Sequence, residues 1–308
     1  MAEIGKEEKA AVLRVLESGT LSGYLAGQLN GGQEVNALEQ EWAAHFGYKH
    51  AVAMNSATSG LIAACAVVNN AHQGRRFIVS PLTMSASAIG PLVYDGTIVF
   101  CDIEPDLFCL DARALKKSLN SDTCAVIVTD LFGQAYDPKI NRLADDRGVY
   151  VIEDASQRPM PGQGDLVVYS LNYHKHIHCG EGGVVCTNID EMADELRLVR
   201  NHAENTDTPY FGFNFRLTEI QASIAREQLK KLPGVLKERQ DQANKLKGLA
   251  PVREGFEHAW YLFPYLDNAP EEAFEYNSYL PRLELFRNTQ GVLPVAEEVV
   301  KRLRVVRP

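Results

Sequence analysis

A lysine in an unusual setting is the residue whose chemistry stands out in this sequence. Lys175 lies between two short apolar runs, Leu166–Tyr169 and Gly183–Thr187, that have the length and β-branched content of buried strands. Burial disfavours the charged form of a lysine and makes its amine a better nucleophile. The glycines at 180, 182 and 183 let a backbone or a ligand approach closely. A solvent-facing surface lysine is the plainer interpretation, and residues elsewhere in the chain decide against it.

Two further stretches suggest a place for an anion and for a charged partner. The small polar turn 55–60 follows the expected strand His50–Met54 and opens an apolar helix, a geometry that offers free N–H groups to a phosphate. Ser56 or Thr58 is equally suited to act as a simple helix cap. Asp154 follows the apolar run Val149–Ile152, where it could cap a helix, ligate a metal or pair with a ring nitrogen.

The histidines around the lysine raise the question of a metal. Alternating His174, His176 and His178, with Cys179, could face one side of a strand and ligate zinc. The sequence nearby supplies no convincing remaining ligands, and the charge of Lys175 would repel the ion. We therefore predict no metal site.

The elements expected around these residues alternate between strands and helices. We expect strands at 50–54, 77–80, 97–101, 124–129, 149–153, 166–169 and 183–187. We expect helices at 7–17, 35–46, 85–93, 110–119, 139–147 and 189–201, and one that opens at the turn 55–60 and runs through 68. Such repetition predicts an α/β fold with a mainly parallel sheet and helices on both faces, whose ligands bind at the carboxyl ends of the strands. Asp154, Thr58 and Lys175 can reach one such edge.

The remaining third of the chain is expected to be organised differently. A helix from Leu217 to Leu232 should break at Pro233-Gly234 and resume over Val235–Leu249. We therefore place a domain boundary there, with a large domain over 1–232 and a small one over 233–308. The tail should contain a strand within His258–Leu266 and a helix over Ala296–Leu303.

Composition narrows the class of protein. Hydrophobic content of 45% and charged content of 23% are ordinary for a soluble globular chain of 308 residues. The net charge of −9 argues against a nucleic-acid surface, and we see neither a membrane-spanning run nor a signal peptide. Six cysteines without paired short spacings suit buried, reduced thiols, so we expect a cytoplasmic protein.

With these features in place, the chain resembles the DegT/DnrJ/StrS nucleotide-sugar aminotransferases, which use pyridoxal phosphate and have the aspartate-aminotransferase fold. The resemblance extends from about Lys6 to Leu249 and rests on an ordered series of motifs. These are Phe46-Gly47, Asn55-Ser56-Ala57-Thr58, Pro81-Leu82-Thr83, Val99–Ile103, Gly133, Ile152–Gln157, Tyr169-Ser170-Leu171, Lys175, Gly180-Glu181-Gly182-Gly183 and Gly212–Arg216. The set in this order is far more specific than any one member.

The resemblance implies a pyridoxal phosphate (PLP) site and a role for each of its residues. Lys175 would form the Schiff base and move the proton between the substrate carbon and the cofactor. Asp154 would pair with the pyridinium nitrogen, and Gln157 would lie near the phenolic oxygen. The remaining cofactor-binding residues would hold the phosphate or face the ring: Ala57, Thr58 and Ser170, with Asn214 reaching the neighbouring subunit of a homodimer, and Met84.

The resemblance also implies the substrates and two points of departure. L-glutamate would donate the amino group to a keto-sugar nucleotide, for surface glycans or natural products, with Arg216, His258 and Trp260 touching the substrates. Met84 stands where the family commonly has a stacking aromatic, although a thioether can partly replace one. Because the sequence ends at Pro308, where relatives continue, we expect a reduced small domain. A sugar dehydratase on the same scaffold and a catalytically inactive binding or regulatory homologue remain alternatives.

Overall fold

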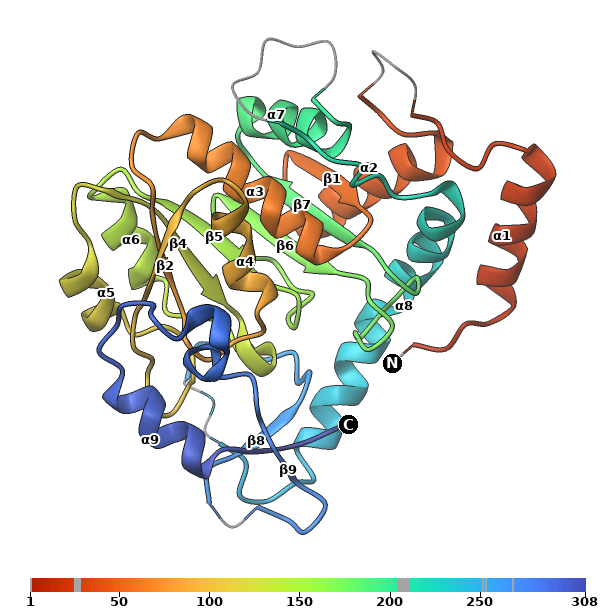
Figure 1. Ribbon diagram of the computed structural model, residues 1–308. Helices are drawn as coiled ribbons and strands as arrows, with labels where there is room; N and C mark the ends of the chain where they lie inside the picture. The colour runs from red at the N-terminus through yellow and green to blue at the C-terminus, as the bar shows by residue number, and fades with distance from the viewer. Residues whose placement is uncertain (1, 25–28, 204–210, 251, 253, 268) are drawn as a thin grey trace.

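The computed structural model describes residues 2–24, 29–203, 211–250, 252, 254–267 and 269–308. Its centre is a seven-stranded sheet of order β1-β7-β6-β5-β4-β2-β3 (Figure 1). The strands are β1 (His50–Met54), β2 (Arg76–Val79), β3 (Thr97–Phe100), β4 (Thr123–Thr129), β5 (Tyr150–Asp154), β6 (Leu166–Ser170) and β7 (Gly183–Thr187). Strands β3, β2, β4, β5 and β6 are parallel to one another, whereas β7 is antiparallel to both β6 and β1. The predicted mainly parallel sheet is confirmed.

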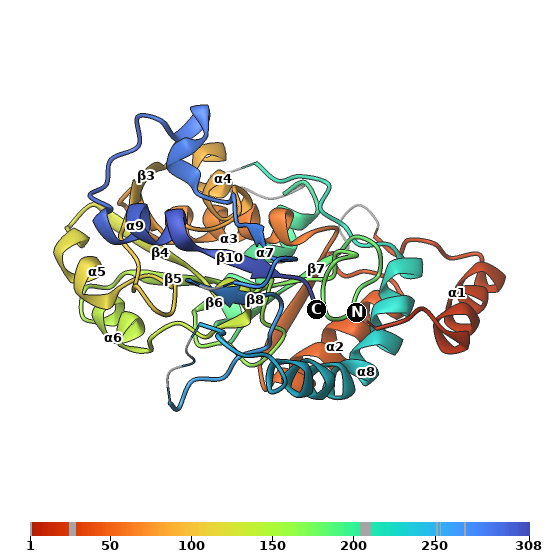
Figure 2. The same cartoon turned by 90° about the horizontal axis from the view of Figure 1, so that it is seen from below.

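Helices cover both faces of this sheet and make three layers (Figure 2). One face packs against α3 (Ala57–Ala71), α4 (Ala86–Val93) and α7 (Asp190–Arg200). The other face packs against α2 (Gln33–Phe46), α5 (Ala112–Ser118), α6 (Lys139–Asp145) and α8 (Glu219–Ala243), and α1 (Lys6–Ser18) lies on α8. The predicted α/β architecture is therefore confirmed.

The strand sequences explain why both faces are covered. Successive residues of a strand point to opposite sides, so Val52 and Met54 enter the core beneath α3 while Ala51 and Ala53 enter the core beneath α2 and α8. The middle strands are apolar on both sides, as is usual for parallel sheets between helices. Consequently, polar side chains gather where the strands end.

Helix α8 corrects one prediction. It runs for 25 residues without a break at Pro233, so the expected interruption was wrong. Proline removes one N–H and crowds the preceding turn, but Leu229, Leu232 and Val235 around it are buried in the core that α8 shares with α2. Their burial outweighs the local cost, which is about 3 kcal/mol in an exposed helix. The division of the chain at 232/233 stays a prediction.

The C-terminal part forms a small antiparallel sheet of order β8-β10-β9. Its elements are β8 (Phe263–Tyr265), β9 (Phe274–Glu275), α9 (Pro294–Arg302) and β10 (Arg304–Val306), with single 3-10 turns at Leu280–Arg282 and Glu284–Phe286. The strand expected within His258–Leu266 is confined to β8, and the residues before it are irregular. Among the described residues, no helix combines the length and apolarity needed to cross a membrane.

Candidate active site

Lys175 lies in the loop between β6 and β7, and few polar groups surround its amine. Its backbone N–H closes a turn on Asn172 O at 2.9 Å, and Nζ lies 4.4 Å from the centre of the Tyr261 ring. No described residue forms an ion pair with Nζ. Burial lowers the pKa of Lys175 from 10.5 to about 8, and the negative charge of Asp154 opposes this shift only in part. At pH 7 about one amine in ten is therefore unprotonated, far more than for a lysine with the ordinary pKa.

Asp154, the last residue of β5, is fixed by hydrogen bonds on both carboxylate oxygens. Ser87 Oγ donates to Oδ2 at 2.6 Å, and the Ser156 N–H donates to Oδ1 at 3.1 Å. Ser87 in turn contacts Thr83 Oγ1 at 2.9 Å, which lies 3.0 Å from Thr129 Oγ1. This buried hydroxyl network holds the carboxylate at the carboxyl edge of the sheet.

The turn before α3 leaves donors free at the same edge. Ser56 Oγ accepts from the Ser59 N–H at 3.0 Å, so Ser56 is the N-cap, and the Gly60 N–H bonds to Ser56 O. Ala57 and Thr58 precede that first helical hydrogen bond, and their N–H groups point out of the helix start. The helix dipole adds attraction for an anion there.

Gly183 brings the end of β6 against this turn. It is paired with Ser170 on one side and Met54 on the other. A Cβ at Gly183 would lie 2.6 Å from the Ala57 nitrogen, so only glycine lets β7 approach the start of α3 so closely. As a result, Ser170 and the start of α3 meet around Gly183.

Gln157 is held from the neighbouring loop. Its Oε1 accepts from the Phe132 N–H at 2.7 Å, within the 3-10 turn Leu131–Gly133. Phe132 itself has a left-handed φ of 61°, an unusual conformation for a bulky residue. The side chain of Gln157 is therefore oriented by strained backbone after β4.

Asn214 and Arg216 lie together beside the α3 turn. Asn55 Nδ2 donates to Asn214 O at 3.1 Å, and Arg216 Nε donates to Asn214 Oδ1 at 3.0 Å. Arg216 Nη1 also donates to Asn201 Oδ1 at 3.0 Å. Asn214 is exposed, and its predicted reach to a neighbouring subunit stays a prediction.

The side chains of Met84, His258 and Trp260 have no described contact with Lys175 or Asp154. Met84 is 60% exposed. The rings of His258 and Trp260 stack at 3.8 Å, and Trp260 Nε1 donates to Gln240 on α8. His258 and Trp260 instead line a separate cavity of about 340 Å³. Their predicted substrate contacts stay predictions.

Two residues of this site, Tyr261 and Ser87, were not predicted from the sequence. Tyr261, which touches the lysine, belongs to a stretch interpreted as a regular strand. Ser87 follows Thr83 by four residues, a spacing that places both on one side of a helical turn, and this was the available signal. Tyr261 offered no comparable signal, because its contact depends on how the irregular segment folds back.

The donor set fits pyridoxal phosphate. An amine with a lowered pKa, a fixed carboxylate and a helix start with free N–H groups meet the needs of its aldehyde, ring nitrogen and phosphate. The residues that would hold it are Lys175, Asp154, Gln157, Ala57, Thr58 and Ser170.

The histidines beside the lysine have other contacts. His176 Nε2 lies 2.7 Å from Ala259 O, whereas the side chain of His174 is exposed. Within the described ranges, no group of three or more His, Cys, Asp or Glu is arranged to hold a metal ion. All six cysteines are buried and unpaired, as expected.

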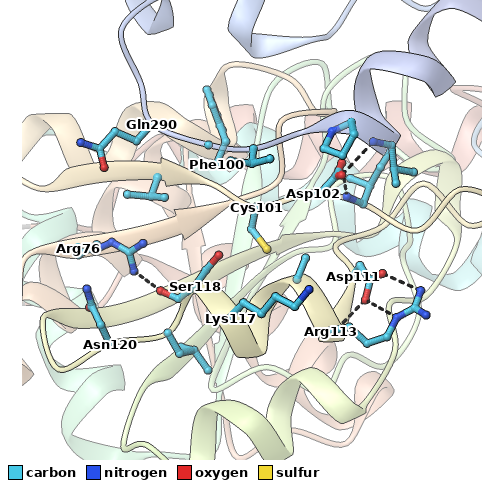
Figure 3. Close-up of a pocket in the computed structure, with 18 residues that line it drawn as sticks. Arg76, Phe100, Cys101, Asp102, Asp111, Arg113, Lys117, Ser118, Asn120 and Gln290 are labelled. Atoms are coloured by element: carbon cyan, nitrogen blue, oxygen red, sulfur yellow. Dashed lines mark hydrogen bonds and ion pairs between the residues drawn. The ribbon is translucent and has the colours of Figure 1, made fainter.

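A larger cavity of about 880 Å³ lies beside β3, the outermost strand at one side of the sheet (Figure 3). It is enclosed by β3, α5 and residues 290–295. Its polar groups are mostly engaged: Arg76 donates to Ser118 O, and Arg113 pairs with Asp111. None of the predicted site residues lines it. The cavity is therefore separate from the lysine site.

Comparison with known sequences gives a consistent set of relatives. A sequence model of the DegT/DnrJ/EryC1/StrS aminotransferase family matches residues 2–263. Spore coat polysaccharide biosynthesis protein SpsC of Bacillus subtilis is 31% identical over 84% of this chain and 73% of its own length. GDP-perosamine synthase of Caulobacter vibrioides is 33% identical, but over 65% of this chain and 57% of its own length.

A further relative and two solved structures point to the same family of proteins. UDP-4-amino-4,6-dideoxy-N-acetyl-beta-L-altrosamine transaminase of Campylobacter jejuni is 31% identical over 70% of this chain and 61% of its own length. DesV of S. venezuelae, solved with a ketimine intermediate, superposes with a TM-score of 0.87 at 26% identity over 98% of this chain and 88% of that one. PseC of Helicobacter pylori, at 24% identity, shares the fold with a TM-score of 0.84 over 99% of this chain and 91% of that one.

Proposed function

Because the chain belongs to the DegT/DnrJ/EryC1/StrS aminotransferase family, we propose that it transfers an amino group from glutamate to a keto-sugar nucleotide with pyridoxal phosphate as cofactor. The family membership confirms the resemblance drawn from the sequence motifs. The observation that carries the proposal is the amine of Lys175, which has few hydrogen-bond acceptors around it and a pKa of about 8. It lies at the carboxyl edge of the sheet, where Asp154 is held by hydrogen bonds. The activities for which the relatives are named support a nucleotide-sugar substrate in amino-sugar biosynthesis.

The side chains divide the work of the reaction. Pyridoxal phosphate, when bound, supplies the electron sink that stabilises a carbanion. Lys175 would hold the cofactor's reactive carbon, and its amine would then take a proton from one carbon and deliver it to another. Asp154, kept in place by Ser87, would keep the ring nitrogen protonated.

The other residues would bind and orient. The N–H groups of Ala57 and Thr58, with the hydroxyl of Ser170, would hold the phosphate at the start of α3. Arg216 is suited to a carboxylate of the donor, since a guanidinium can make two parallel hydrogen bonds to one. We also propose that His258 and Trp260 contact the sugar of the substrate. Met84 would contact the ring of the cofactor.

We further propose a homodimer with shared active sites in the cytoplasm. Exposed Asn214 lies beside the α3 turn, where it is available to a second copy of the chain. Apolar side chains on and after α1, Leu13, Leu16 and Leu21, are about half exposed at 56%, 51% and 46%, which suits a covered surface. The buried, unpaired thiols suit a reducing compartment.

The first prediction tests the reaction. Purified protein is incubated with pyridoxal phosphate, L-glutamate and a panel of keto-sugar nucleotides, and products are identified by mass spectrometry. We expect one substrate to gain an amino group, and Lys175→Ala to reduce the rate at least about 10³-fold, because it removes the proton-transferring group.

The control is folding, since circular dichroism of Lys175→Ala should match that of the wild type. Turnover that persists in this variant would remove Lys175 from the mechanism. A product that has lost oxygen without gaining nitrogen would instead favour a dehydratase, and no turnover together with no cofactor binding would favour an inactive homologue.

A further inference from the structure

The irregular segment before β8 is attached to the edge of the sheet that carries the lysine. The Ala259 N–H donates to Gly133 O and the Tyr261 N–H donates to Phe132 O, both at 2.8 Å. Ala259 O lies 2.7 Å from Nε2 of His176, the residue after the lysine. The segment is thus bound both to the loop after β4 and to the lysine loop.

An unusual backbone conformation turns two neighbouring aromatic rings in different directions. Trp260 has a φ of 53°, a costly conformation for a bulky residue that persists only where its surroundings enforce it. The Trp260 ring packs with Phe263 and Tyr265 and donates Nε1 to Gln240. Tyr261 packs instead against the core beneath α3, on the side of the lysine.

The Tyr261 ring is in direct contact with the reactive amine. Lys175 Nζ lies over the ring face, 4.4 Å from its centre, well within the range of a cation–π interaction. The negative face of the ring attracts an ammonium group without offering a hydrogen-bond acceptor. The contact therefore holds the amine in place without fixing its proton.

The charged groups around this pair come from several elements. Asp154 at the end of β5 acts on Lys175 through its charge. His176 beside it is held neutral, because burial lowers its pKa to about 3. Arg239 of α8 acts on both His176 and Tyr261, and Arg307 near the C-terminus acts on Tyr261. Neither arginine is among the groups that shift the pKa of Lys175.

We propose that Tyr261 is a positioning residue for Lys175, its ring face holding the amine at the carboxyl edge of the sheet. Its part in the reaction rests on the proposed function. When the amine is free to move a proton, the ring limits where Nζ can lie, so the proton is delivered from one direction. Nothing in this role requires the Tyr261 hydroxyl.

The test measures the amine itself in cofactor-free protein. Trace acetylation of Lys175 is followed by peptide mass spectrometry as a function of pH, which gives the midpoint of its protonation. Tyr261→Leu keeps apolar bulk but removes the ring, so we expect the midpoint to fall by about 0.5 to 1 pH unit. Tyr261→Phe keeps the ring face and should restore the wild-type midpoint.

Tyr136→Leu is the matched control, because it removes a buried tyrosine from the core around α5 and α6 on the opposite face of the sheet. Its midpoint should equal that of the wild type. An unchanged or raised midpoint in Tyr261→Leu, or a fall shared equally by Tyr261→Phe or Tyr136→Leu, would overturn the inference. The labelling needs no turnover, so the effect of Tyr261 on the amine is measurable even in a protein without aminotransferase activity.

In the active enzyme the same variants separate positioning from substrate binding. Tyr261→Leu should lower kcat about 10-fold or more with KM for the sugar nucleotide unchanged, and Tyr261→Phe should restore kcat. A rise in KM at unchanged kcat would contradict a role exerted through Lys175.

Discussion

Lys175 is a half-buried cation and Arg200 a buried one, and the chain surrounds them in opposite ways. Arg200 is fully buried, and its Nη1 donates to Glu39 Oε1 at 2.5 Å and to Ala53 O at 3.0 Å. Its Nη2 donates to Leu29 O at 2.7 Å. Lys175 has a tyrosine ring and a carboxylate that acts only through its charge.

The electrostatic outcome differs accordingly. Burial lowers the pKa of Arg200, but the charge of Glu39, the negative influence of Tyr24 and the hydrogen bond to Glu39 together outweigh it, so the pKa is raised and the charge is permanent. Burial lowers the pKa of Lys175 to about 8 because nothing comparable opposes it. A buried cation with acceptors therefore serves structure, whereas a buried amine without them is available for chemistry.

Removing each charge while keeping the bulk of the side chain should have very different effects at the two positions. Arg200→Met leaves Glu39 buried and unpaired, so the free energy of unfolding should fall by about 3 to 5 kcal/mol. Lys175→Met should not destabilise the protein at pH 7, because no described partner is left behind. Urea denaturation of the two variants measures both, and equal destabilisation would contradict the distinction.

The pH dependence of stability gives a smaller effect with a definite sign. Between pH 8 and 10.5 the unfolded Lys175 still binds its proton while the folded one has lost it, so this residue makes stability rise with pH. At pH 7 its buried charge costs up to about 3 kcal/mol. Lys175→Met should exceed the cofactor-free wild type in stability at pH 7, and the gap should close by about pH 10.5. A gap independent of pH would mean an ordinary lysine.

The mainly parallel sheet could be predicted from the sequence, because its strands are apolar on both faces and alternate with helices. It also predicted that Lys175, Asp154 and the α3 turn lie at or after the ends of strands, as the structure has them, whereas their roles toward a cofactor stay predictions. Local rules failed at Pro233, where the burial of Leu229 and Val235 overrides proline's effect on the helix. They failed again at Tyr261, because its direction depends on the left-handed Trp260 and on hydrogen bonds to a loop over a hundred residues away.

Trapping the amine that meets the cofactor decides whether Lys175 is the reactive group of this protein. The protein is incubated with pyridoxal phosphate, reduced with borohydride, digested, and searched by mass spectrometry for a lysine that carries the pyridoxyl mass. We expect this mass on Lys175, and its loss from that peptide in Lys175→Met. A wild-type protein that carries the mass on surface lysines while the Lys175 peptide stays unmodified would contradict this assignment.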